Sequence, residues 1–347
     1  MVDSKQQWKA WLYLLPAIIL LLIFTVWPII NTVRIAFLVN YSPLDAIKGI
    51  HFDIGFDNFA KVVSYSGFLT CIKNTMLLTI LTVPISCFLA LIVSVFLNSI
   101  PRFSKFFQTV YFLPYVTNSI AIGMVFAMMF NIIGLRTVPV VDAGAFDVYN
   151  TYFTTVPYID PVTGDSMLQV VEMGQIADSW GIINNLIIFF GGEPISWINQ
   201  GSDYAANIAV MVIYIVWNAL PMKILILLGG LQSVNKQYYD AAKIDGTSAT
   251  RTFFKITVPL LSPMIAYTVI TSFIGGFKEY SSIVGVFGDT MGPASDKGRL
   301  NTMVGFIYDS LSGDKYGRAS AAALILFGII LVVTLINLYV SNKKVHY

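Results

Sequence analysis

The sequence predicts an all-α integral membrane protein with six transmembrane helices. Hydrophobic residues make up 56% of the 347-residue chain and charged residues only 12%, about half the charged fraction of an average soluble domain. Six hydrophobic segments each reach the ~20 residues that a helix needs to cross about 30 Å of hydrocarbon. These predicted spans are 11–37, 75–97, 107–133, 205–231, 258–277 and 319–340.

Prolines interrupt several of the spans, at Pro16, Pro28, Pro84, Pro114, Pro221 and Pro263. Soluble helices rarely tolerate internal proline, whereas in membrane helices neighbouring helices satisfy the freed carbonyl groups. The first span follows Lys5 and Lys9, as in a secretory signal peptide. It is, however, longer than the usual hydrophobic region of about 7–15 residues and has no clear cleavage site. We therefore expect an uncleaved first helix.

The distribution of charge predicts that both termini are cytoplasmic. An even number of spans leaves both ends on the same side of the membrane. If that side is inside, the inner segments carry ten of the 21 Lys and Arg residues but only three of the 19 acids. These segments are 1–10, 98–106, 232–257 and 341–347, about 52 positions, whereas the outer loops are roughly three times as long with a similar number of bases. The positive-inside rule favours this orientation.

The predicted outer loop 137–204 is strongly acidic. No Lys or Arg occurs from Thr137 to Met222, whereas the same interval holds eight acids. Turn signals at Pro157, Pro161 and "TGD" separate short runs that favour β-structure. Two interpretations stay open, a small folded extracytoplasmic insert and an acidic solvated loop.

The segment "YYDAAKIDGTSATRTFFKITVPLLSP" (238–263) joins spans four and five, and its loop is 232–257. Residues 238–244 favour a short helix, and Asp245-Gly246 is a turn signal because glycine adopts positive φ without strain. Thr247 or Ser248 can cap a second short helix through "ATRTFFKI". Phe253 and Phe254 have no obvious core to join. They either fold back onto the membrane helices or enter a pocket on another protein.

This loop resembles the cytoplasmic coupling loop of the permeases of binding-protein-dependent ABC importers. The family signature is Glu-Ala-Ala, three residues, Gly, nine residues, Ile, one residue and Leu-Pro. Here Asp240-Ala241-Ala242, Gly246, Ile256 and Val258-Pro259 stand at these spacings, with Asp for Glu and Val for Leu. Segments such as "FFQTVYFLPYVTNSIAIGMVFAMMFN" and "GGLQSVNKQYYDAA" extend the resemblance to carbohydrate permeases of the maltose/glycerol-phosphate class.

The resemblance implies that residues 1–347 form the transmembrane domain of a carbohydrate importer in a bacterial cell membrane, with no catalytic activity of its own. In the family this loop docks into a groove of the ATPase subunit. The residues expected to form this contact are the motif residues Asp240, Ala241, Ala242, Gly246, Ile256 and Pro259, together with Asp245, Phe253 and Phe254 of the same loop.

Several partners are implied by the same resemblance. They are a second permease subunit, an ATP-binding cassette ATPase dimer, an extracytoplasmic solute-binding protein, the carbohydrate itself and the lipid bilayer. ATP and Mg are then bound by the ATPase, since this chain has no Gly-x-x-x-x-Gly-Lys-Ser/Thr phosphate loop. No metal, cofactor or nucleic acid is expected on this chain.

Spans four and five flank the coupling loop, and in maltose-type permeases the sugar contacts come from these two regions. Counting from Asp240, the corresponding residues are Trp217, Asn218, Ala219, Met222, Ser272, Gly276 and Glu279, and Tyr214 is a further candidate because it lies near the middle of span four. Aromatic faces stack on sugar rings, and amides or carboxylates bond the hydroxyl groups. Packing within the bundle is the alternative role for these residues. Lys223, toward the inner end of span four, is expected to snorkel to the membrane surface.

Two other functions stay open at the level of the sequence. Importers of amino acids, peptides or polyamines share the coupling loop. An intramembrane enzyme would need a buried nucleophile–base or metal constellation, but His51 and His346 both lie outside the predicted spans. Cys71 and Cys87 lie 16 residues apart, about 24 Å along one helix, which is too far for a disulfide.

Overall fold

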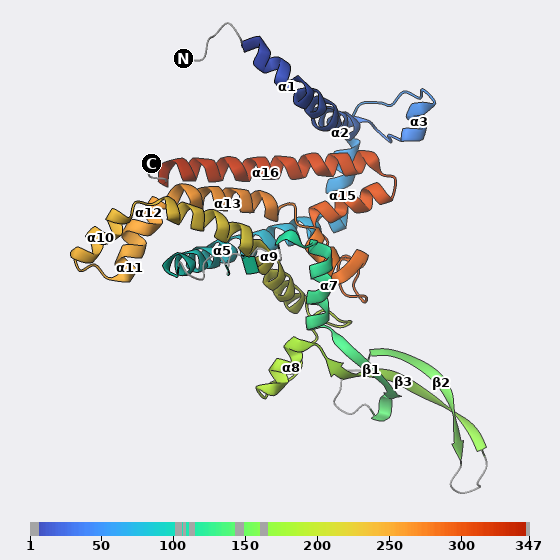
Figure 1. Ribbon diagram of the computed structural model, residues 1–347. Helices are drawn as coiled ribbons and strands as arrows, with labels where there is room; N and C mark the ends of the chain where they lie inside the picture. Colours follow the sequence, from blue (N-terminus) through green and yellow to red (C-terminus); the bar gives the residue numbers. More distant parts are fainter. Residues whose placement is uncertain are drawn as a thin grey trace. The chain divides into compact units, whose positions relative to one another are not determined.

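The computed structural model describes residues 7–100, 106, 109–110, 115–142, 149–159 and 166–344 (Figure 1). Within these ranges the chain is mostly helical and divides into two compact units. Unit 1 comprises residues 1–76, 273–278 and 302–343, and unit 2 comprises residues 77–272, 279–301 and 344–347. Helices α5 (Ser66–Ser99) and α13 (Ser262–Gly276) contribute residues to both units.

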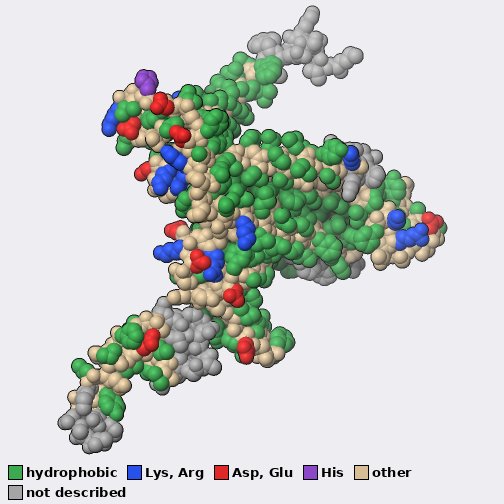
Figure 2. All heavy atoms as spheres, turned by 180° about the vertical axis from the view of Figure 1, so that it is seen from behind, with side chains coloured by type: hydrophobic (Ala, Val, Ile, Leu, Met, Phe, Trp, Pro, Cys, Tyr) green, Lys and Arg blue, Asp and Glu red, His purple; other side chains and the backbone are tan. Residues whose placement is uncertain are grey.

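Four helical segments are long and apolar enough to cross a membrane: Trp11–Phe37, Ser66–Ser99, Tyr204–Ser233 and Tyr316–Ser341. A fifth candidate is the pair Ala249–Leu260 and Ser262–Gly276, which is bent by 69°. Figure 2 shows hydrophobic side chains over most of the helical surface in that view, as expected where lipid replaces water. The predicted membrane fold is confirmed, but a sixth span is not found among the described residues.

The predicted span 107–133 differs most from the structure. Residues 107–108 and 111–114 lie outside the described residues. Helix α7 (Ser119–Phe130) has 12 residues, about 18 Å at 1.5 Å per residue, too short to cross the membrane alone. The chain becomes extended at Asn131, and strand β1 begins at Ile132. The apolar residues at the end of the predicted span therefore start a strand. The sequence did not show this, because hydrophobicity alone does not distinguish a helix from a strand.

The fifth predicted span, 258–277, is broken at Leu261. Helix α12 (Val258–Leu260) ends there, and α13 begins at the next residue. Pro259 and Pro263 each lack the N–H group that would continue the helical hydrogen bonds. The two prolines therefore account for the bend, and the sequence contained this signal.

Unit 1 consists of helices from both ends of the chain. They are α1 (Gln7–Leu21), the π-helical turn η2 (Leu22–Val26), α2 (Trp27–Phe37), α3 (Pro43–Ile47), α4 (Asp57–Val63), α15 (Met303–Ser312) and α16 (Tyr316–Lys344), with the first part of α5. Their core contains Ala36, Val62, Phe68, Cys71, Phe277, Met303, Phe306, Ala321, Ala322 and Leu326.

The side chain of Asn58 joins several of these elements. It is 4% exposed and donates to the carbonyl oxygens of Ala36 at 3.0 Å and Leu38 at 2.9 Å. These bonds satisfy acceptors that the end of α2 leaves without helical partners. An added Cβ at Gly317 would lie 2.6 Å from the amide nitrogen of Asn58. The start of α16 therefore packs directly on this amide because residue 317 has no side chain.

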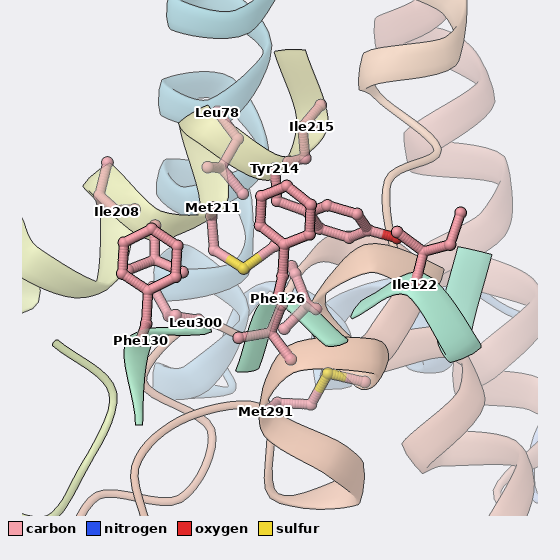
Figure 3. Close-up of a cluster of buried hydrophobic side chains, with 13 residues drawn as sticks. Leu78, Ile122, Phe126, Phe130, Ile208, Met211, Tyr214, Ile215, Met291 and Leu300 are labelled. Carbon is pink, nitrogen blue, oxygen red and sulfur yellow. The ribbon is translucent and has the colours of Figure 1, made fainter. Parts of the chain in front are cut away.

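Unit 2 is built around α9 (Tyr204–Ser233), with α7, α8 (Ile182–Phe189), α14 (Ser281–Phe287) and the short 3-10 turn η5 (Gly288–Thr290). Figure 3 shows Phe126 of α7 beside Tyr214 of α9 in its core, with ring centroids 4.8 Å apart. An added Cβ at Gly123 would lie 2.6 Å from the Cα of Gly285. The backbones of α7 and α14 are thus in contact, a close approach that small residues permit in membrane helices.

Between α7 and α8 the chain forms a three-stranded antiparallel sheet of β1 (Ile132–Pro139), β2 (Tyr149–Ile159) and β3 (Ser166–Trp180), with a 3-10 turn η3 (Val140–Asp142) after β1. Figure 1 shows β3 in the middle, in the order β1-β3-β2. At its base Ile132 pairs with Trp180, and the Gly181 N–H donates to the Asn131 carbonyl at 2.9 Å. The ends of the insert are therefore held side by side.

Candidate coupling segment and solute path

The segment after α9 forms a helix, a tight turn and a second short helix (Figure 1). Helix α10 (Lys236–Ile244) begins at Asn235, whose side chain accepts from the Gln237 N–H at 3.0 Å. Helix α11 (Ala249–Thr252) begins at Ser248, whose hydroxyl accepts from the Arg251 N–H at 3.4 Å. The predicted helix–turn–helix shape is confirmed, and Ser248 rather than Thr247 is the cap.

The turn between the two helices depends on Gly246. Its φ is +64°, the left-handed region that side chains disfavour, and nothing lies within 4 Å of an added Cβ. The Asp245 and Thr247 N–H groups donate to the carbonyls of Ala241 and Ala242, each at 2.9 Å. These bonds satisfy acceptors at the end of α10. Glycine is therefore required here by backbone conformation and not by lack of space.

The two phenylalanines continue from α11 into a π-helical turn, η4 (Phe253–Thr257). Their rings make an edge-to-face contact with centroids 4.9 Å apart. Phe253 is half-buried, whereas Phe254 is 62% exposed. In α10, Tyr238 and Ile244 are also exposed. The Phe253 ring therefore packs partly against the protein, whereas the Phe254 ring is exposed, as are Tyr238 and Ile244.

The remaining motif residues divide by exposure. Ala242 is buried, and Ile256 and Pro259 are half-buried. Asp240, Ala241 and Asp245 are exposed, and Asp240 lies 3.8 Å from the Lys243 ammonium. The structure thus places the motif in one continuous segment, with Ala242, Ile256 and Pro259 turned at least partly inward and both acids at the surface.

In α9 the candidate path residues have different environments. Tyr214 has no exposed surface, and its hydroxyl group donates to the Ser119 carbonyl and lies 3.1 Å from the Ser119 hydroxyl. Trp217 is partly exposed and packs on Phe126, with ring centroids 5.2 Å apart. Its burial and its two contacts with Ser119 make Tyr214 a residue of the protein core.

Asn218, Ala219 and Met222 follow on the same helix. Asn218 and Ala219 are half-buried, and Met222 is exposed. Residues four apart lie on one helix face, so Asn218 and Met222 are neighbours. Of the candidates in α9, Asn218 is the one that offers an accessible amide.

Among the candidates around α13, the Ser272 hydroxyl and the Glu279 carboxylate both form hydrogen bonds within the protein. The Ser272 hydroxyl donates to the Thr268 carbonyl at 2.5 Å, and Gly276 is half-buried in the part of α13 that belongs to unit 1. Glu279 is half-buried, and its Oε1 accepts from the backbone N–H groups of Tyr280 at 3.2 Å and Ser282 at 3.1 Å. Glu279 therefore satisfies free donors at the start of α14, a favourable place for an acid.

The expectation that Lys223 snorkels is wrong for this structure. Lys223 is 9% exposed, and its ammonium group donates to the Ser86 hydroxyl of α5. This bond could not be predicted from the sequence because the two residues are 137 positions apart. Among the described residues, no group of three or more His, Cys, Asp or Glu side chains could hold a metal ion.

The chain is similar over nearly its whole length to known transport proteins. It is 25% identical to the arabinooligosaccharides transport system permease protein AraP of Bacillus subtilis (strain 168), over 96% of this chain and 88% of AraP. It is 25% identical to the lactose transport system permease protein LacF of Rhizobium radiobacter, over 95% and 91% of the two chains. The trehalose/maltose transport system permease protein MalF of Thermococcus litoralis is 32% identical, over 48% of this chain and 54% of MalF.

Solved structures show the same fold. A bacterial ABC transporter involved in the import of the acidic polysaccharide alginate matches with a TM-score of 0.70 and 19% identity, over 98% of this chain and 97% of that chain. A second alginate ABC transporter structure, in complex with an alginate pentasaccharide-bound periplasmic protein, matches with a TM-score of 0.69 and 20% identity, over 99% and 98%.

A family model also matches the chain directly. It is described as the binding-protein-dependent transport system inner membrane component, and it covers residues 83–346. That range includes α9, the bent α12–α13 pair and every residue of the coupling motif. Together with the shared fold, the match means that this chain belongs to the family of inner membrane components of binding-protein-dependent transport systems.

Proposed function

We propose that this chain is the permease subunit of an ATP-driven carbohydrate importer and forms half of its translocation pathway. The names of the relatives support the cargo class, because they specify arabinooligosaccharides, lactose and trehalose/maltose. The relatives are named as transport permeases and not as enzymes. The ATP and Mg belong to a separate ATPase dimer, since this chain has no phosphate loop.

Coupling to the ATPase is assigned to the segment 232–257 and the adjoining Pro259. The observation that carries this proposal is the exposed apolar surface of Tyr238, Ile244 and Phe254 on a segment that carries the spaced motif. Burying one such side chain in a partner contributes about 1.5–3 kcal/mol. The exposed Phe254 ring is therefore expected to enter the ATPase groove, while the half-buried Phe253 fixes its position.

The proposed topology places both termini and the coupling segment in the cytoplasm of a bacterial cell, with the loop 137–204 outside. A second permease subunit completes the pathway, and an extracytoplasmic binding protein delivers the solute. The sheet exposes Phe153 and Leu168, which makes the insert a candidate contact for that binding protein.

The solute path is assigned first to Asn218 and Met222, with Trp217 beside them. Asn218 and Met222 share a helix face, and Asn218 supplies donors and an acceptor for sugar hydroxyl groups. Tyr214, Ala219, Ser272, Gly276 and Glu279 remain candidates. Tyr214 and Glu279 join the path only if their present hydrogen bonds are exchanged for bonds to the solute.

The coupling proposal is tested with Phe254→Ser in the reconstituted complex of both permeases, ATPase and binding protein. The matched control is Phe190→Ser, since Phe190 is 82% exposed but lies just after α8. We expect Phe254→Ser to reduce ATPase co-purification and uptake by about tenfold, a conservative share of the value of a buried aromatic ring. The control should leave both unchanged. Wild-type co-purification and uptake for Phe254→Ser would remove the segment from the coupling contact.

The topology is tested by cysteine labelling in intact cells. Val170 of β3 and Lys243 of α10 are both exposed. With Cys71 and Cys87 replaced by serine, Val170→Cys should react with an impermeant thiol reagent in intact cells. Lys243→Cys should react only after permeabilisation. The reverse pattern would place both segments on the opposite sides of the membrane.

The cargo is tested with the ligands of the partner binding protein. Oligosaccharides should stimulate ATP hydrolysis by the complete complex, whereas amino acids, peptides and polyamines should not. If only amino acids, peptides or polyamines stimulate ATP hydrolysis, the protein is still an importer permease but its cargo is not a carbohydrate.

A further inference from the structure

Unit 1 contains a pocket lined by charged residues, small polar residues and tyrosines, and none of its lining residues belongs to the coupling segment or the candidate solute path. Its volume is about 630 Å³, within the range of about 300–1,000 Å³ that small-molecule sites occupy. Its walls come from the loop 40–42 after α2, from α4, from the residues 64–65 before α5, and from residues 314–318 at the start of α16. Segments that are distant in sequence thus meet around one cavity.

The charge of the pocket is positive. Lys61, Lys315 and Arg318 line it, and Asp314 is the one acid among the lining residues. Asp314 accepts a hydrogen bond from the Tyr316 hydroxyl at 3.1 Å. The Lys61 ammonium donates to the Asn40 side chain at 2.9 Å, which uses one of its three donors. An anion in the pocket would therefore meet a net surplus of positive charge and of donors.

Arg318 is held in place by its neighbours. Its Nε donates to the Ser310 hydroxyl at 3.0 Å. The guanidinium carbon lies 5.4 Å from the centre of the Tyr65 ring and 5.1 Å from that of Phe306. These contacts fix a side chain that otherwise has many rotamers, while its two terminal nitrogens carry four more donors. A fixed guanidinium group suits a phosphate, which it can bind through two parallel hydrogen bonds.

The start of α16 adds to the same field. The helix has 29 residues, and the first N–H groups of a helix lack helical partners and carry partial positive charge. Gly317 stands at this point and is buried against Asn58. The backbone at the helix start is therefore part of the pocket wall, together with the three basic side chains.

We propose that this pocket binds the phosphate headgroup of an anionic phospholipid. The pocket lies where α2 ends and α16 begins, and both helices belong to candidate membrane spans. Exposed apolar side chains such as Ile30 and Phe327 continue along these two spans, where acyl chains would lie. Tyr41, Tyr65 and Tyr316 line the pocket, and tyrosine is enriched where membrane spans meet the headgroup region.

The test compares lipid retention in the detergent-purified complex, by native mass spectrometry, after exchange into phosphatidylglycerol or phosphatidylcholine. The variant is Lys61→Gln with Lys315→Gln, because both lysines are exposed and their loss should not affect folding. The control is Lys48→Gln, an exposed lysine that pairs with Asp45 at 3.9 Å and does not line the pocket. At about 1 kcal/mol for each basic side chain near an anionic lipid surface, the loss of two charges corresponds to about a 30-fold change in lipid affinity.

We expect the wild type and Lys48→Gln to retain phosphatidylglycerol in preference to phosphatidylcholine. The double variant should lose this preference and keep its thermal unfolding temperature in phosphatidylcholine. Unchanged phosphatidylglycerol retention in the double variant would overturn the proposal. If inorganic phosphate or glycerol phosphate alone raises the thermal unfolding temperature of the delipidated protein as much as the lipid does, the occupant is a soluble anion and the lipid proposal is overturned. Loss of binding-protein affinity with unchanged lipid retention would make the pocket a protein contact, which also overturns the proposal.

Discussion

Two glycine-dependent regions of unit 2 differ in what the glycine provides. At the crossing of α7 and α14, Gly123 and Gly285 give space, because an added Cβ would lie within 3 Å of the opposite backbone. At the turn between α10 and α11, Gly246 has open space around it but a φ of +64°. The first region is thus constrained by packing and the second by backbone conformation. Substitution should harm folding at the crossing and coupling at the turn.

The largest expected effect is that of Gly123→Val at the crossing. The valine side chain meets backbone atoms of α14, which cannot move aside as a flexible side chain would. Such overpacking costs about 1–3 kcal/mol or more, so the yield of folded protein and the thermal unfolding temperature should fall strongly. The control is Gly229→Ala in α9, where nothing lies within 4 Å of the added Cβ. Equal stability of the two variants would contradict the close contact of α7 and α14.

A smaller loss of stability and a specific loss of transport are expected for Gly246→Val. A left-handed conformation costs a residue with a side chain about 1–2 kcal/mol, which the exposed turn can relieve by changing shape. Uptake per assembled complex should fall about tenfold, which corresponds to 1.4 kcal/mol. Gly246→Asn should retain most of the uptake, because asparagine tolerates this conformation. If valine and asparagine behave alike, the turn geometry does not matter for coupling.

Two substitutions of Glu279, which lies at the start of α14, separate its helix-capping role from a role in transport. Glu279→Ala removes the acceptor at the start of α14 and should destabilise the protein by about 1 kcal/mol. Glu279→Gln keeps an oxygen acceptor and should retain most of that stability. If the carboxylate also bonds solute, the glutamine variant should lower uptake per complex several-fold. Wild-type uptake in Glu279→Gln would limit the residue to its helix-capping role.

The smallest expected effect is that of Asn218→Ala on α9. One lost hydrogen bond to the sugar costs about 0.5–1.5 kcal/mol, so the half-saturating substrate concentration should rise several-fold. Thermal stability should change little, because Asn218 is only half-buried. Reconstituted vesicles with a defined number of complexes give the required measurement. Unchanged saturation with lowered stability would instead assign Asn218 to packing.

The same contrast explains what the sequence could predict. The long spans depend on local composition, and four of the six predicted spans have counterparts among the unbroken candidate membrane helices. The turn at Gly246 and the cap at Ser248 are also local signals. The break at Leu261 was visible in its flanking prolines, but membrane helices often tolerate proline. Local signals were therefore sufficient where a few neighbouring residues decide the conformation.

Features that depend on contacts between distant segments were not predictable. Strands β1 and β3 pair over separations of 34 to 48 positions, from Pro139 with Met173 to Ile132 with Trp180. The Lys223–Ser86 bond and the contact of Gly317 with Asn58 likewise join distant segments. Of the candidate site residues, the burial of Tyr214 and the capping role of Glu279 needed the three-dimensional arrangement. The sequence "EYSSIVGVF" contained a signal for the cap, since an acid before a short apolar run is typical of a helix start.

The closed base of the sheet makes the insert modular. Because Ile132 pairs with Trp180 and Gly181 bonds Asn131, the chain leaves and re-enters the helical part of unit 2 at adjacent points. The two attachment points therefore stay adjacent however many residues lie between Ile132 and Trp180. A shorter hairpin or an unrelated domain with closely spaced ends is geometrically compatible with the same two attachment points. This junction is accordingly the natural place to graft a reporter or an affinity module without altering the packing of α7.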